Sequence, residues 1–179
     1  MTRRITMHRL LFGVLAISHV FGSGCGYKLI DYQEPPSDLQ SVSISTFRND
    51  SYEPGVEFVV ADALRREFLR RGVVALASDS SEADLVIEGV VQPINIRTRS
   101  FSSVALALEW EITLRLSVHT VRPDGSIVRI DEESTQSTER YLASADIEAT
   151  RKNRDEAMRR MATVLAARVH DMLYEVAFP

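Results

Sequence analysis

Apolar and polar residues alternate most regularly between Leu106 and Val118. Successive side chains of a β-strand point to opposite faces, so this segment predicts a long strand with one apolar and one polar face. The apolar positions are Leu106, Leu108, Trp110, Ile112, Leu114, Leu116 and Val118. We expect this face to lie in the core and the opposite face to contact water.

Two further strand patterns precede this segment. Residues 42–47 form a short run of β-forming residues, and residues 84–99 predict a longer strand. Pro93 in the longer run requires an edge position or a bulge, because proline lacks the N–H that a strand ladder needs. The residues on one face of this strand are Leu85, Ile87, Gly89 and Val91.

A turn signal follows the long alternating strand. Proline and glycine in the segment 122–125 occupy the positions that a tight turn favours, so residues 126–139 are expected to return as an antiparallel strand. The second half of this returning segment, 132–139, is strongly polar and predicts an exposed strand or a loop.

Two segments show the period of an α-helix. From Val56 to Arg71 apolar residues recur every three or four positions, and Gly72 follows as the expected helix end. A second helix is expected from about Ser144 or Thr150 to Tyr174. Its apolar stripe consists of Ala157, Met161, Leu165, Val169 and Met172.

These elements predict an α+β fold in the order β-α-β-β-β-α. Two helices would pack on one face of a mostly antiparallel sheet of about four strands, in a single domain spanning residues 40–179. A chain of this length is long enough to bury most of the surface that its unfolded state exposes.

The N-terminal segment predicts export and a lipid anchor. A basic start, an apolar run and small residues before Cys25 form a signal segment at residues 1–24. Cleavage there would leave Cys25, the single cysteine, as a lipidated N-terminus, and residues 25–39 with Pro35 and Pro36 would form a tether. Gly22 departs from the usual lipobox leucine, so an ordinary signal peptide with an incidental cysteine is the alternative.

The net charge and the motifs of the sequence exclude several classes of function. The chain has 21 Lys and Arg against 25 Asp and Glu, and loss of three signal arginines leaves 18 against 25, a net charge of −7. Nucleic acid is therefore an unfavourable partner. No metal-ligand spacing, nucleophile motif or phosphate loop occurs, so no metal, cofactor or enzymatic activity is expected, apart from the covalent lipid on Cys25.

Four short motifs resemble one known family. They are Gly24-Cys25-Gly26-Tyr27, Phe47-x-Asn49, the segment 83–89 with its alternating apolar residues, and Asn153-x-x-Glu156-Ala157. In this order and spacing, together with the long alternating strand, they resemble the lipopolysaccharide-assembly lipoproteins, the LptE family. The resemblance covers nearly all of the chain after Cys25.

The resemblance implies an outer-membrane lipoprotein that faces the periplasm and plugs the β-barrel protein LptD during lipopolysaccharide transport. It also implies that two basic pairs contact the anionic glycolipid: Arg97 with Arg99, and Arg151 with Lys152. Ordinary surface charge is the alternative for each of these residues. Two other readings stay open, a lipid-anchored auxiliary subunit of an ATP-binding-cassette envelope transporter and, less favoured, a periplasmic hydrolase.

Overall fold

The computed structural model describes residues 39–101 and 107–177, all within the second of two units, Glu34–Pro179. The expected signal segment, Cys25 and all of the tether but Leu39 lie outside the described residues. The boundaries drawn from the sequence for these parts therefore remain predictions.

The two predicted helices are present. Helix α2 spans Val56–Arg71, as the apolar period indicates, and Gly72 follows it in the left-handed conformation with φ of 65°. The Gly72 N–H donates to the Phe68 carbonyl at 3.0 Å, which closes the last turn. Helix α3 spans Ile147–Ala177 and extends a few residues beyond the predicted end.

Eight strands form one mixed sheet, so the expected number of about four strands is wrong. Most of the paired residues are in antiparallel pairings, as expected. The strands are β1 (Ser41–Ile44), β2 (Arg48–Asn49), β3 (Ala75–Leu76), β4 (Leu85–Val91), β5 (Asn95–Phe101), β6 (Ala107–Val121), β7 (Ile127–Arg129) and β8 (Gln136–Leu142). A short 3₁₀ helix, η1, spans Ser80–Glu82. β1 runs parallel to β3 and β4, and β2 runs parallel to β4.

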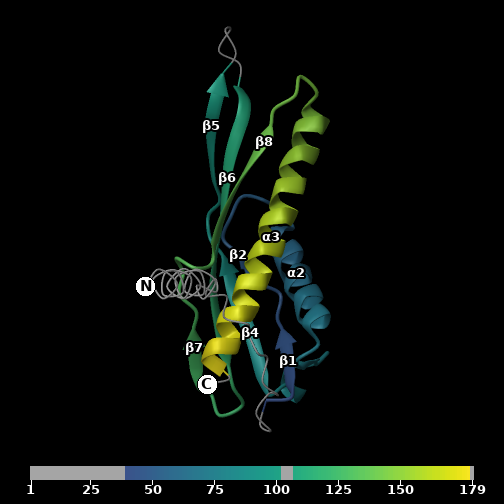
Figure 1. The fold of residues 1–179 in the computed structure, drawn as a ribbon, viewed down its shortest axis with the longest axis vertical. Helices are drawn as coiled ribbons and strands as arrows, with labels where there is room; N and C mark the ends of the chain where they lie inside the picture. Colours follow the sequence, from purple (N-terminus) through teal and green to yellow (C-terminus); the bar gives the residue numbers. More distant parts are fainter. Residues whose placement is uncertain (1–38, 102–106, 178–179) are drawn as a thin grey trace, which may run out of the picture. The chain divides into compact units, whose positions relative to one another are not determined.

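Two of the four additional strands, β2 and β3, are only two residues long, and the other two arise because predicted strands are interrupted. Pro93 divides the expected strand 84–99 into β4 and β5, which follow one another along the same edge of β6. Along the other edge, β7 and β8 are separated by residues 130–135, so the returning segment is also divided. β6 alone runs unbroken past all four of these strands (Figure 1).

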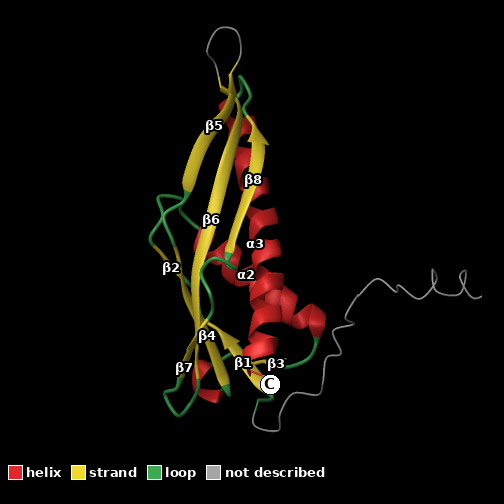
Figure 2. Ribbon diagram, turned by 60° about the vertical axis from the view of Figure 1, so that its left-hand side comes forward, coloured by secondary structure: helices red, strands yellow, loops and turns green. Residues whose placement is uncertain are grey.

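Both helices lie on the same side of the sheet (Figure 2), as expected from the sequence. Every second residue of β6 from Ile112 to Val118 is buried and packs in the core with apolar residues of α2 and α3. Leu108 keeps this alternation but is exposed, so the apolar face continues beyond the part of β6 that the core covers.

Polar side chains and one glycine fix the first strands in place. The Asp84 carboxylate accepts hydrogen bonds from the backbone N–H groups of Gln40 and Ser41 at 2.9 and 2.8 Å. Gly89 faces Phe47, and a Cβ built at Gly89 would lie 2.6 Å from the Phe47 ring. These residues of the family-like motifs therefore have structural roles.

Candidate functional site

The first basic pair, Arg97 and Arg99, lies on β5 at the edge of the sheet. Arg97 is directly opposite Glu111 of β6, and its Nε donates to the Asn95 Oδ1 of its own strand at 2.9 Å. The pairing shifts register between Thr98 and Ser100. In this irregular stretch the Arg99 Nε lies 3.5 Å from the Glu111 Oε2.

A third arginine reaches the same carboxylate from the other side. Arg140 of β8 is also opposite Glu111, and its Nε lies 3.8 Å from the same oxygen, Oε2. We call Arg97, Arg99, Glu111 and Arg140 the Glu111 cluster. Three positive charges and one negative charge give it a net charge of +2, within a chain whose overall charge is negative.

The Glu111 cluster lies on the face of the sheet that carries no helix. Glu111 alternates along β6 with the buried residues Ile112 and Leu114, which face the helices, so its own side chain points away from them. On the same face, the Arg115 guanidinium donates to Gln136 Oε1 at 3.0 and 2.5 Å. Cross-strand hydrogen bonds therefore hold several polar side chains in place on this surface.

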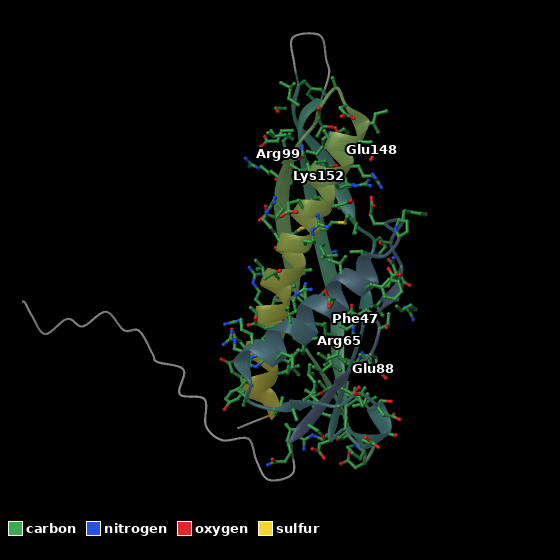
Figure 3. The ribbon with its side chains drawn as sticks, turned by 90° about the vertical axis from the view of Figure 1, so that its right-hand side faces the viewer. Phe47, Arg65, Glu88, Arg99, Glu148 and Lys152 are labelled. Carbon is green, nitrogen blue, oxygen red and sulfur yellow. The ribbon has the colours of Figure 1, made fainter. Side chains whose placement is uncertain are left out.

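The second basic pair, Arg151 and Lys152, is separate from the first. Both residues lie near the start of α3, which packs on the opposite face of the sheet (Figure 3). The Arg151 Nη2 donates to the Glu148 Oε2 at 2.6 Å, and this bond raises the pKa of Arg151. Within the described residues, no hydrogen bond or ion pair joins the two basic pairs.

Acidic side chains surround the second pair. Asp146, Glu148 and Asp155 line the same open depression as Arg151 and Lys152. Three negative charges beside two positive charges weaken the local attraction for an anion. Glu109 lines a depression together with Arg140, and counting it lowers the net charge of the Glu111 cluster from +2 to +1, whereas the surroundings of the second pair have a net charge of −1. The Glu111 cluster is therefore the more favourable place for an anionic group.

Two arginines held side by side suit a phosphate group. A guanidinium presents several N–H donors in one plane, and two of these can contact two phosphate oxygens at once. Among residues 39–101 and 107–177, no group of three acidic, histidine or cysteine side chains could hold a metal ion. Neither helix in this part of the chain is long and apolar enough to cross a membrane.

The comparison with protein families decides the assignment. The sequence model of the LptE family, described as lipopolysaccharide-assembly, matches residues 39–173. This chain belongs to the LptE family. The match covers α2, every strand of the sheet, and α3 except for its last residues.

The relatives described next share low sequence identity with this chain. A curated protein of Photorhabdus laumondii, the LPS-assembly lipoprotein LptE, is 28% identical over 120 residues, which are 67% of this chain and 62% of that protein. The chain thus spans about three fifths of the length of this relative. The crystal structure of rare lipoprotein B from Shewanella oneidensis matches with a TM-score of 0.51 at 14% identity, covering 76% of this chain and 95% of that chain. This second likeness shows a shared fold.

Arg140 was not predicted as a site residue. Its sequence surroundings are polar and resemble any exposed strand. Only the register of β8 against β6 places Arg140 opposite Glu111. The sequence does not reveal this register, because residues 130–135 between β7 and β8 show no pattern that predicts where the pairing resumes.

Proposed function

We propose that this LptE-family chain is an outer-membrane lipoprotein that assists lipopolysaccharide assembly together with an LptD-type β-barrel. The family match over residues 39–173 carries this proposal, and the name of the Photorhabdus laumondii relative agrees with it. The role is structural and non-enzymatic.

The lipid anchor is part of the same proposal. Acylation of Cys25 would tie the chain to the periplasmic face of the outer membrane, and the proline-containing segment after Cys25 would act as a tether. Mass spectrometry of the mature N-terminus tests this step. An unmodified thiol at Cys25 would remove the anchor and leave the fold unaffected.

The helix-free face of the sheet suits contact with the inner wall of a barrel. The interior of a large outer-membrane barrel is polar, so its occupant must present polar side chains. On this face the Thr113 and Thr138 hydroxyls are 2.9 Å apart, and Arg115 is held by Gln136. Side chains that are already held in place lose less conformational entropy when a partner binds.

The proposed contacts with lipopolysaccharide are Arg97 and Arg99, with Arg151 and Lys152 as a second pair. Charge supports the first pair more strongly, since Arg99 lies near one carboxylate, that of Glu111, whereas three carboxylates line the depression of the second pair. The glycolipid carries negative charge, which the guanidinium groups of Arg97 and Arg99 would compensate.

Co-purification tests the proposed function. The full chain, expressed with an affinity tag in its native envelope, is expected to retain an LptD-type barrel and lipopolysaccharide after mild detergent extraction. Crosslinkers placed at Glu109 and Arg115 on the helix-free face should join the chain to the barrel. Recovery of an inner-membrane ATP-binding-cassette complex in place of the barrel would contradict the proposal and support the auxiliary-subunit alternative.

A further inference from the structure

The interruption between β7 and β8 is an ordered segment that is fixed to β6. Thr135 is fully buried, its hydroxyl donates to the Leu116 carbonyl at 2.6 Å, and its own carbonyl accepts from the Leu116 N–H at 3.0 Å. At the other end of the segment, the Ile130 N–H donates to the Val118 carbonyl at 3.0 Å. Interruptions of this kind redirect side chains next to regular strands.

This segment brings one carboxylate over the helix-free face. The Glu132 Oε1 accepts a hydrogen bond from the Ser117 hydroxyl at 2.6 Å, and the Ser117 Oγ in turn accepts from the Gln92 Nε2 at 2.8 Å. Two residues farther along β6, the His119 Nε2 lies 3.4 Å from the Glu88 Oε2. Ser117 and His119 are both odd-numbered residues of β6 and therefore share the helix-free face.

A half-enclosed pocket of about 210 Å³ lies beside these polar groups. It is lined by residues of β6, β7 and the segment after β7: Ser117, Val118, His119, Ile127, Arg129, Ile130 and Glu132. Ile127 and Ile130 give the pocket an apolar wall, and Glu132 supplies a carboxylate. Sites for drug-sized molecules are usually about 300–1,000 Å³, so this space suits a single protein side chain better.

The charge beside the pocket is negative. Glu132 and Glu88 contribute two carboxylates and Arg129 contributes one guanidinium, which gives a net charge of −1 with the histidine neutral. Asp131 and Glu133 adjoin Glu132 in the sequence and increase the negative charge of this region. A cationic group is therefore the complementary occupant.

We propose that this pocket binds a basic side chain, arginine or lysine, from the inner wall of the LptD-type barrel. The aliphatic stem of that side chain would pack against Ile127 and Ile130, and its charged end would contact the Glu132 carboxylate. This inference rests on the proposed function and adds one specific contact to it. The Glu111 cluster has the opposite charge farther along the same face, so a partner complementary to both regions would dock in one orientation.

Competitive assembly tests this contact. The barrel would be co-expressed with equal amounts of the unaltered full chain and a variant, each with its own tag, and the ratio of the two chains in the purified complex gives their relative affinity. Glu132→Gln is expected to bind about tenfold more weakly, because a charge-assisted hydrogen bond is lost. Thermal unfolding checks the fold, which should persist because the amide oxygen still accepts from Ser117.

Glu133→Gln is the matched control for Glu132→Gln. Both variants remove one negative charge from the same exposed segment, but Glu133 lies outside the pocket lining. Glu133→Gln should therefore assemble nearly as well as the unaltered chain. Unchanged assembly of Glu132→Gln, or equal losses in the two variants, would overturn the proposal.

A photoreactive residue at Ile127 identifies the occupant. We expect a crosslink to a barrel segment that contains arginine or lysine. Replacement of that basic residue by glutamate should weaken the complex, and Glu132→Lys in the chain should restore it by exchanging the two charges. Crosslinks solely to barrel segments that lack a basic residue would overturn the proposal.

Two further outcomes separate this inference from the proposed function. If the unaltered chain recovers no barrel, the proposed function fails, and the inference fails with it. If the barrel is recovered but Glu132→Gln assembles normally, only the pocket contact fails. Free arginine that binds the unaltered chain but not Glu132→Gln, with normal barrel assembly in both, would make the pocket a small-molecule site and overturn the inference.

Discussion

The Arg154 Nη1 donates to the Glu53 Oε1 at 2.9 Å and so joins residues that lie 101 positions apart in the chain. Glu53 belongs to the loop before α2, and Arg154 belongs to α3. The Asn49 side chain donates to the backbone carbonyl of Glu53 at 2.8 Å and to the Glu57 Oε2 at 2.7 Å. The loop is thereby tied to both helices.

We expect Glu53→Gln to destabilise the fold by about 1–3 kcal/mol, because the partly buried Arg154 charge would lose its partner. The Glu53 and Arg154 side chains are 15% and 30% exposed, so water compensates only part of the loss. Chemical denaturation measures the change in the free energy of unfolding. In the exposed pair Glu156 and Arg159, the matched Glu156→Gln should cost less than about 1 kcal/mol. Equal costs for the two variants would show that burial does not matter here.

Gly89→Ala should destabilise the domain by about 1–3 kcal/mol through overpacking. A Cβ at this position would lie 2.6 Å from both the Phe47 ring and the Ser117 backbone oxygen, and the backbone atom cannot move away cheaply. Thermal unfolding measures the loss. Phe47→Leu combined with Gly89→Ala should recover only part of the stability, since the contact with Ser117 remains. Full recovery would assign the whole cost to the Phe47 ring.

Stability is expected to fall between neutral and mildly acidic pH because of His170. Burial is the main cause that lowers the pKa of His170 below its ordinary value of 6.5, and the Arg71 charge lowers it further, while Asp171 and Glu67 oppose the shift. As pH falls below about 6.5, the unfolded chain takes up a proton that the folded ring resists, so the free energy of unfolding decreases. This loss ends once the pH is below the folded-state pKa.

Denaturation curves at pH 7.5 and 5.5 test this dependence. Carboxylates also titrate, so the relevant quantity is the difference between the unaltered chain and His170→Gln. The variant is expected to lose less stability over this interval. An identical loss in both chains would show that His170 does not contribute. Because His170 packs against Phe68 at a ring-centroid distance of 4.8 Å, the variant should be less stable at both pH values.

Charge reversal should distinguish the two basic pairs. We expect Arg97→Asp with Arg99→Asp to weaken binding of lipopolysaccharide to the purified chain by at least tenfold, because the Glu111 cluster would change from net +2 to net −2. The matched double reversal, Arg151→Asp with Lys152→Asp, should have a smaller effect, since three acidic residues already surround that pair. Circular dichroism checks that both variants fold. A larger effect of the second reversal would reverse the ranking of the two pairs.

The sequence predicted the helices well because their signals are local. The apolar period from Val56 to Arg71 and the glycine at position 72 specify α2 without reference to the rest of the chain. The alternating residues of β6 likewise identify its buried face. The number of strands was wrong for two reasons. Pro93 and residues 130–135 divide two predicted strands, and β2 and β3 are only two residues long, too short to give a sequence pattern.

The candidate site was only partly predictable for a related reason. Arg97 and Arg99 were proposed through the family resemblance, but Glu111, which lies opposite Arg97 and near the Arg99 guanidinium, was not. Arg140 joins them only through the register of β8, which depends on pairing between residues far apart in sequence. Pairing across strands is a tertiary property, and a local pattern does not specify it.

The two faces of β6 have different and independent roles. Its even-numbered residues from Ile112 to Val118 fill the core, and its odd-numbered residues form the helix-free face. Relatives of this chain are therefore free to exchange residues such as Glu111 or Arg115 and acquire a different ligand preference without repacking the interior. Insertion of a single residue at the middle of β6 would instead exchange the two faces beyond it, so the strand tolerates substitution far better than a change in length.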